Sequence, residues 1–176
     1  MNISELRLKT SLQETTIERL QQQIEREAYA SSLYLAMAAW CHQQGLQGCG
    51  NFFKKQSGEE RTHMLKIFDY LIDSGAEAIS PEITNIPKTF ENLYTLLITF
   101  LEQEISVTES YNDLTGFCFE NKDYKTAQFL QWYLNEQLEE EQTARRCVEI
   151  YELVGTENGG LYRVDKEIEK LILSAS

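Results

Sequence analysis

The sequence predicts an all-α protein: a bundle of four long helices, with a long crossover between the second and third helices and a short fifth helix at the C-terminal end. Only two prolines occur in 176 residues, Pro81 and Pro87, and both fall in one segment. On either side of that segment the apolar residues recur with the period of an α-helix, and the alternation typical of strands is scarce. Glycines at positions 45, 75 and 155 mark the ends of three helical stretches.

These breaks define five helices in order. We expect them at about residues 11 or 15 to 42, 48–74, 89–120, 124–154 and 162–173. The segment 75–88 is long enough to carry the chain back along the bundle, so the four long helices should run up, down, down and up. A chain of this length is most simply one domain, 1–176, with its bundle at about 11–155.

The composition bears on the class of function. The formal net charge is −12, which argues against nucleic-acid binding because that requires a basic surface, and which favours the attraction of cations. The four cysteines, Cys41, Cys49, Cys118 and Cys147, form no Cys-x-x-Cys pair. Their spacing argues against a zinc ribbon or a rubredoxin-type iron site and indicates reduced thiols.

No segment predicts export or membrane insertion. The N-terminal sequence lacks the apolar core of a signal peptide. No apolar run approaches the roughly 20 residues that span a bilayer. We therefore expect a cytoplasmic protein without a membrane partner.

A possible metal-binding pair lies in the second predicted helix. Glu60 and His63 are three residues apart, so on a helix they project from one face at adjacent heights. A carboxylate and an imidazole in this arrangement can bind one divalent metal ion. Two polar residues on a solvated helix face would give the same pattern, so the interpretation depends on ligands from other helices.

Each long helix has a stripe of residues spaced alternately three and four apart, as a bundle core requires. The stripes are apolar or aromatic toward their ends and carry one acid near the centre. The four acids are Glu27, Glu60, Glu104 and Glu140. In the third helix we assign the stripe to Phe90, Tyr94, Leu97, Leu101, Glu104, Thr108 and Tyr111. Helices of similar length should bring the four acids to one layer.

Four carboxylates in one buried layer cannot remain ionised without partners, since each is costly to desolvate and like charges add to the cost. Two divalent cations would cancel the four negative charges. Oxygen-rich ligands with one imidazole fit iron better than structural zinc. The sequence therefore predicts a dinuclear iron site, and the alternative is that the four acids face water.

The same segments resemble a bacterial non-haem ferritin, over about residues 17–171. The resemblance is carried by Glu27-Ala-Tyr-Ala-Ser-Ser-Leu-Tyr34, Glu59-Glu-Arg-Thr-His63, Phe129-Leu-Gln-Trp-Tyr-Leu-Asn-Glu-Gln137, Glu139-Glu-Glu141 and Gly160-Leu-Tyr-Arg-Val-Asp-Lys166. It implies that the first iron is held by Glu27, Glu60 and His63, with Glu60 bridging to the second iron. Ligands of the second iron would be Glu104 and Glu140, with Gln137 beside it.

Two further roles follow from the resemblance. Tyr34 matches the family's tyrosine next to the centre, a hydrogen-bond partner and an electron donor. A third iron, just inside the pair, would be bound by Glu59, Glu136 and Glu139, with Glu140 shared.

The sequence also departs from related patterns. Di-iron bundles commonly carry two Glu-x-x-His motifs, whereas here Gln137-Leu-Glu-Glu140 stands in the place of the second. Arg61 occupies the position where a haem-ligating methionine would follow the bridging glutamate. Both departures disfavour bacterioferritin, and no haem is expected.

The resemblance implies an iron-storage protein with ferroxidase activity. Glu60 and Tyr34 would support oxidation of Fe²⁺ to Fe³⁺ by dioxygen or hydrogen peroxide, and the ferric mineral would be stored in a homo-oligomeric cage of 24 subunits. The alternatives are a di-iron peroxidase or oxidase that forms no cage, and a metal-free helical bundle that serves as an interaction module.

Overall fold

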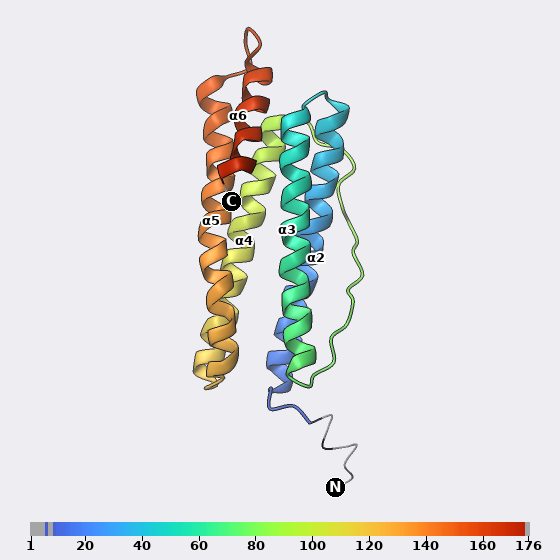
Figure 1. The fold of residues 1–176 in the computed structure, drawn as a ribbon, viewed down its shortest axis with the longest axis vertical. Coiled ribbons are helices and arrows are strands. Elements are labelled where there is room, and N and C mark those ends of the chain that lie inside the picture. The colour runs from blue at the N-terminus through green and yellow to red at the C-terminus, as the bar shows by residue number, and fades with distance from the viewer. Residues whose placement is uncertain (1–5, 7–8, 175–176) are drawn as a thin grey trace.

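The computed structural model describes residues 6 and 9–174 of the chain. The described part contains the helices α2 (Glu14–Gln43), α3 (Gln47–Asp73), α4 (Leu93–Glu120), α5 (Tyr124–Val154) and α6 (Gly160–Ser174), and no strand. The four long helices lie side by side, and the segment between α3 and α4 runs along the outside of the bundle for most of its length (Figure 1). The predicted all-α architecture, with its up-down-down-up order, is confirmed.

The helix ends lie where the sequence predicts breaks. Gly45 and Gly75 follow α2 and α3 with φ angles of 81° and 77°, in the left-handed region that glycine adopts without strain. Lys122 has a φ of 59° in the turn between α4 and α5. Asp123 then accepts a hydrogen bond from the backbone N–H of Thr126 at 3.1 Å and so caps α5.

The predicted start of the third long helix is wrong by four residues, because α4 begins at Leu93 rather than near residue 89. Asn92 forms a capping box with Thr95. The Thr95 N–H donates to Asn92 Oδ1 at 3.0 Å, and the Asn92 N–H donates to Thr95 Oγ1 at 3.2 Å. This reciprocal pair satisfies two backbone donors at the start of the helix and fixes its first turn.

The predicted buried face of the same helix also needs correction. Tyr94 is exposed, and Leu101 and Thr108 are only half-buried. The buried residues are instead Leu93, Leu96, Leu97, Phe100, Glu104, Val107, Tyr111, Leu114, Thr115 and Cys118. Because α4 packs against both α2 and α5, its buried face is broader than a single stripe and is rotated toward Leu93 and Phe100.

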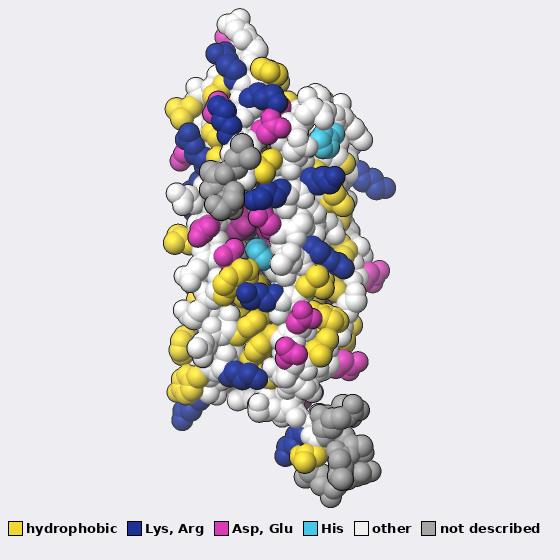
Figure 2. All heavy atoms as spheres, viewed as in Figure 1, with side chains coloured by type: hydrophobic (Ala, Val, Ile, Leu, Met, Phe, Trp, Pro, Cys, Tyr) yellow, Lys and Arg dark blue, Asp and Glu magenta, His cyan; other side chains and the backbone are white. Residues whose placement is uncertain are grey.

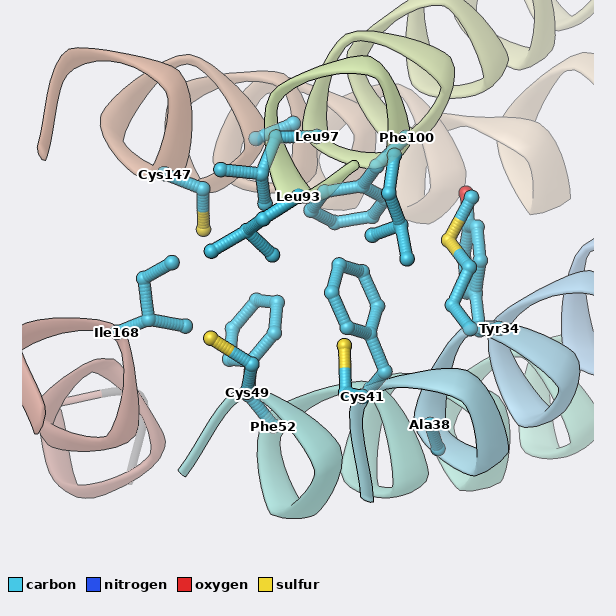
Figure 3. Packing of buried hydrophobic residues seen from close by; sticks show 14 of the residues in the cluster. Tyr34, Ala38, Cys41, Cys49, Phe52, Leu93, Leu97, Phe100, Cys147 and Ile168 are labelled. Atoms are coloured by element: carbon cyan, nitrogen blue, oxygen red, sulfur yellow. The ribbon is translucent and has the colours of Figure 1, made fainter. Parts of the chain in front are cut away.

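Two apolar clusters fill the bundle, one on each side of the layer that holds the acids. The cluster next to α6 includes Phe52, Phe53 and Phe100, whose rings pack edge-to-face with centroids 5.2 to 5.9 Å apart (Figure 3). The other includes Leu20 and Ile67. Both clusters hold the long helices in fixed register, which sets the height of the acids between them.

All four cysteines are free, as the sequence indicates, and the structure shows that all four are buried. Burial raises the pKa of Cys41 to about 12 and that of Cys118 to about 11, which makes these thiols poor nucleophiles. None of the described helices combines the length and the apolar composition that crossing a membrane would require.

Candidate metal centre

The four predicted acids come together in the middle of the bundle. Glu27, Glu60, Glu104 and Glu140 come from α2, α3, α4 and α5, and their exposed fractions are 0, 2, 1 and 9%. They do not face water. On the surface, acidic side chains gather at mid-height on the face that α3 and α5 form, beside a histidine (Figure 2).

Two sets of ligand atoms lie close enough to bind metal ions. The first set is Glu27, Glu60 and His63, and the second is Glu60, Glu104 and Glu140, with the ligand atoms of each set within 4.8 Å of one another. In the first set His63 Nδ1 lies 3.1 Å from Glu60 Oε2 and 3.9 Å from Glu27 Oε2. Glu60 belongs to both sets, so its carboxylate has the position that a bridging ligand needs.

Hydrogen bonds satisfy some of these carboxylate oxygens and leave others open. Glu27 Oε2 and Glu60 Oε1 are buried without any hydrogen-bond partner. An unpaired buried carboxylate oxygen is costly. Because both orphaned atoms belong to the first set, their lone pairs are available to a cation. The donor set of carboxylates and one imidazole suits iron in either oxidation state.

Ionisation of all four carboxyl groups in this buried layer is unfavourable. Burial raises the pKa of all four carboxyl groups above their usual range, and the negative charge of a neighbouring glutamate adds to this effect for each of them, although at Glu104 the hydrogen bonds from Tyr34 and Gln137 oppose it. The pKa of Glu140 is raised to about 9. These shifts mean that the ionised forms of the four carboxyl groups are disfavoured in the layer. Cations between the carboxylates would stabilise the ionised forms.

Glu104 is oriented by two neighbours. The Tyr34 hydroxyl donates to Glu104 Oε1, and the Gln137 amide donates to Glu104 Oε2 at 3.2 Å. Burial raises the pKa of Tyr34 well above its usual value, so its hydroxyl keeps the proton that it donates. Tyr34 and Gln137 both lie beside the second set of ligands.

The three residues predicted for a third iron lie in a different environment. Glu59 and Glu136 are half-buried, and Glu139 is exposed. All three line a cavity of about 90 Å³ together with Glu140 and Lys55, and the Lys55 ammonium lies 2.9 Å from Glu59 Oε1. Within the described residues these acids form no compact three-ligand set of the kind found in the buried layer.

Three contacts of the layer were not assigned from the sequence. The Tyr111 hydroxyl donates to Glu27 Oε1, and the Gln56 amide donates to Glu140 Oε2 at 3.0 Å. The Trp132 ring packs edge-on against His63 with centroids 5.2 Å apart. Gln56 precedes Glu60 by four residues and Tyr111 follows Glu104 by seven. Helical spacing from the acids therefore places both residues on the stripes, but it does not give their partners.

Comparisons with known proteins identify the family of the chain. Residues 17–154 match the ferritin-like domain family. The chain is 37% identical over 164 residues to a probable bacterial non-heme ferritin-like protein of Haemophilus influenzae, covering 93% of this chain and 99% of that protein. It is 35% identical over 163 residues to the bacterial non-heme ferritin of Campylobacter jejuni, covering 93% and 98%.

A solved structure also matches closely. The open pore ferritin of the hyperthermophilic archaeon Archaeoglobus fulgidus superimposes with a TM-score of 0.87 at 33% sequence identity, over 90% of this chain and 98% of that one. The family match covers most of the bundle, the relatives match nearly end to end, and the layer of buried acids lies at its centre. The chain belongs to the ferritin family.

Proposed function

We propose that this protein is an iron store that oxidises Fe²⁺ at the buried acid layer. The observation that carries the proposal is the pair of three-ligand sets that share Glu60. Two Fe²⁺ ions are the substrates. Glu27 and His63 bind the first ion, Glu104 and Glu140 bind the second, and Glu60 bridges them.

The ligands favour the oxidised product. Carboxylate oxygens are hard anionic ligands, and they stabilise Fe³⁺ more than Fe²⁺. Each Fe²⁺ loses one electron. Dioxygen takes up the two electrons with two protons to give hydrogen peroxide, or hydrogen peroxide takes them up with two protons to give two water molecules. The Tyr34 hydroxyl donates to Glu104, a ligand of the second ion, and holds that carboxylate in place during this step.

Glu59, Glu136 and Glu139 form the proposed third position, on the path from the buried layer to the surface of the bundle. Their partial exposure and the ion pair between Lys55 and Glu59 support a site that holds iron weakly and passes it on. We further propose that 24 chains form a hollow shell and that the ferric product accumulates inside it as mineral. The similarity to ferritins of known structure supports this assembly.

Native mass measurement after aerobic loading with Fe²⁺ tests the proposal. We expect a particle of 24 chains that retains many more iron atoms than two or three per chain. A dimer or smaller species with a fixed iron content would instead support a di-iron peroxidase or oxidase. Failure to bind any Fe²⁺ at neutral pH without oxygen would instead support a metal-free helical bundle that serves as an interaction module.

A further inference from the structure

A second buried tyrosine contacts the metal layer from the side opposite Tyr34. Tyr111 lies on α4 and is fully buried, with an exposed fraction of 0%. Its hydroxyl donates a hydrogen bond to Glu27 Oε1 across the space between α4 and α2. A core tyrosine needs some partner for its hydroxyl, but here the partner is a carboxylate of the first ligand set.

This contact divides the two oxygens of Glu27 between two roles. Oε1 accepts the hydrogen bond from Tyr111, whereas Oε2 is buried without a hydrogen-bond partner. Oε2 is also the oxygen that lies 3.9 Å from His63 Nδ1. The atom left open is therefore the one that points toward the other ligands of the first set.

Tyr34 and Tyr111 form a reciprocal pair. Each lies seven residues after the acid of its own helix, which is Glu27 for Tyr34 and Glu104 for Tyr111. Each donates to the acid of the other helix, because Tyr34 of α2 contacts Glu104 of α4 and Tyr111 of α4 contacts Glu27 of α2. In each ligand set, a carboxylate other than the shared Glu60 thus accepts a hydrogen bond from a tyrosine hydroxyl through one of its oxygens.

The ring of Tyr111 is fixed by its neighbours. It stacks on Tyr133 with ring centroids 4.7 Å apart and an interplanar angle of 19°. The Tyr133 hydroxyl in turn donates to the backbone carbonyl of His63 at 2.9 Å. The stacked pair therefore contacts the Glu27 side chain directly and the His63 backbone through Tyr133, so it connects two ligands of the first set.

We propose that Tyr111 is a positioning residue for the first metal position, and that it restricts Glu27 to binding a metal ion through Oε2 alone. This inference rests on the proposed function, since it assigns Tyr111 a role only if the layer binds metal. Without the hydroxyl, Glu27 is free to rotate or to bind through both oxygens. The coordination of the first ion should then change while that of the second is retained.

Titration of the assembled, metal-free protein with Co²⁺ without oxygen tests the inference, because the visible absorption of Co²⁺ weakens as its coordination number rises. In Tyr111→Phe the ring and its stacking are kept. We expect the first Co²⁺ to bind about tenfold more weakly, as is usual when a contact to a ligand is removed, and its spectrum to change. The spectrum of the second Co²⁺ should match that of the parent.

Tyr34→Phe is the matched control. It should alter the spectrum of the second Co²⁺ and leave that of the first unchanged. Identical first-ion spectra and affinities in Tyr111→Phe and the parent would overturn the inference, and so would equal changes at both positions. A variant that failed to fold would also overturn it, because the hydroxyl would then be a requirement of the fold. If the parent bound no Co²⁺ in the layer, the proposed function itself would fail.

Discussion

Two regions of this bundle bury carboxylates in different ways. At the α6 end, Asp165 is 4% exposed and accepts hydrogen bonds from the backbone N–H groups of Gly48 and Cys49, at 3.0 and 2.8 Å. These donors belong to the first turn of α3, whose N-cap residue, Leu46, provides no side-chain cap. Asp165 therefore supplies the missing cap from another helix, and each of its oxygens has a partner.

The metal layer shows the opposite arrangement. Glu27 and Glu60 each keep one buried oxygen without a donor, and burial raises the pKa of both groups. The comparison shows that burial alone does not identify a functional acid. Asp165, with donors for both oxygens, caps a helix and stabilises the fold, whereas Glu27 and Glu60 each keep one oxygen that is suited to a cation.

The first prediction, with the largest expected effect, concerns the rate of Fe²⁺ oxidation, which should depend on the metal layer and not on Asp165. Glu60→Ala removes the only ligand that belongs to both sets among the described residues. We expect the initial rate of Fe²⁺ oxidation to fall by at least about 100-fold, since loss of a mere supporting contact already costs 10–100-fold. Stopped-flow absorbance of the ferric product measures this rate. His63→Ala should also slow oxidation strongly while the oligomeric state stays that of the parent protein.

The matched control for activity is Asp165→Asn, which keeps the size of the side chain and lies outside both ligand sets. It should oxidise Fe²⁺ at close to the parent rate. A normal initial rate in Glu60→Ala would contradict the assignment of the layer, and a loss of rate in Asp165→Asn would contradict the distinction between the two regions.

The second prediction concerns stability. Asp165→Ala leaves the N–H groups of Gly48 and Cys49 buried without an acceptor, so the free energy of unfolding should fall by about 1–3 kcal/mol. Calorimetry of the metal-free protein measures the change. Glu169→Ala, on the same helix, is the control, because Glu169 contacts only partly exposed side chains, in an ion pair with Lys166 at 2.7 Å and a 3.3 Å hydrogen bond from Asn51, and such exposed pairs contribute little to stability. An equal decrease in the free energy of unfolding of the two variants would show that the hydrogen bonds of Asp165 to α3 do not stabilise the fold more than a surface contact does.

The third prediction is a pH dependence of the metal-free protein. The carboxyl groups of the layer have pKa values raised by burial, to about 9 for Glu140. Between the usual pKa of glutamate and these raised values, the folded state binds more protons than the unfolded state. Stability should therefore fall as the pH rises from about 5 to about 8.

Glu27→Gln tests the origin of that dependence. It removes one of the acids whose pKa is raised, so the variant should melt no lower than the parent at pH 8, and its stability should change less with pH. Melting curves across this pH range provide the measurement. A parent protein that became more stable between pH 5 and 8 would show that other groups dominate.

The smallest expected effect lies at the rim of the layer. Glu139 is exposed, so Glu139→Ala should leave the melting temperature of the metal-free protein nearly unchanged. Titration with Fe²⁺ without oxygen should lose one ion per chain, and later turnover should change. Loss of the fast first phase of oxidation would show instead that the outer acids and the buried pair act as one site.

The sequence was sufficient to predict the elements whose signals are local. Helical periodicity and the breaks at Gly45 and Gly75 located the helices, and one acid at the centre of each stripe located the layer. The start of α4 lies four residues past its predicted position, because the capping box of Asn92 and Thr95 sets the first turn of the helix. Local signals also do not give partners across the bundle. Neither the contact of Tyr111 with Glu27 nor that of Asp165 with α3 follows from spacing within a helix, since both depend on how helices pack.

Anomalous diffraction at the iron edge, from a crystal soaked in Fe²⁺ without oxygen, would locate the bound iron ions. We expect two iron peaks per chain inside the bundle, both adjacent to Glu60. One should lie beside Glu27 Oε2 and His63, and the other between Glu104 and Glu140. Iron found only at surface acids, or a single buried ion that does not contact Glu60, would contradict a dinuclear centre in this layer.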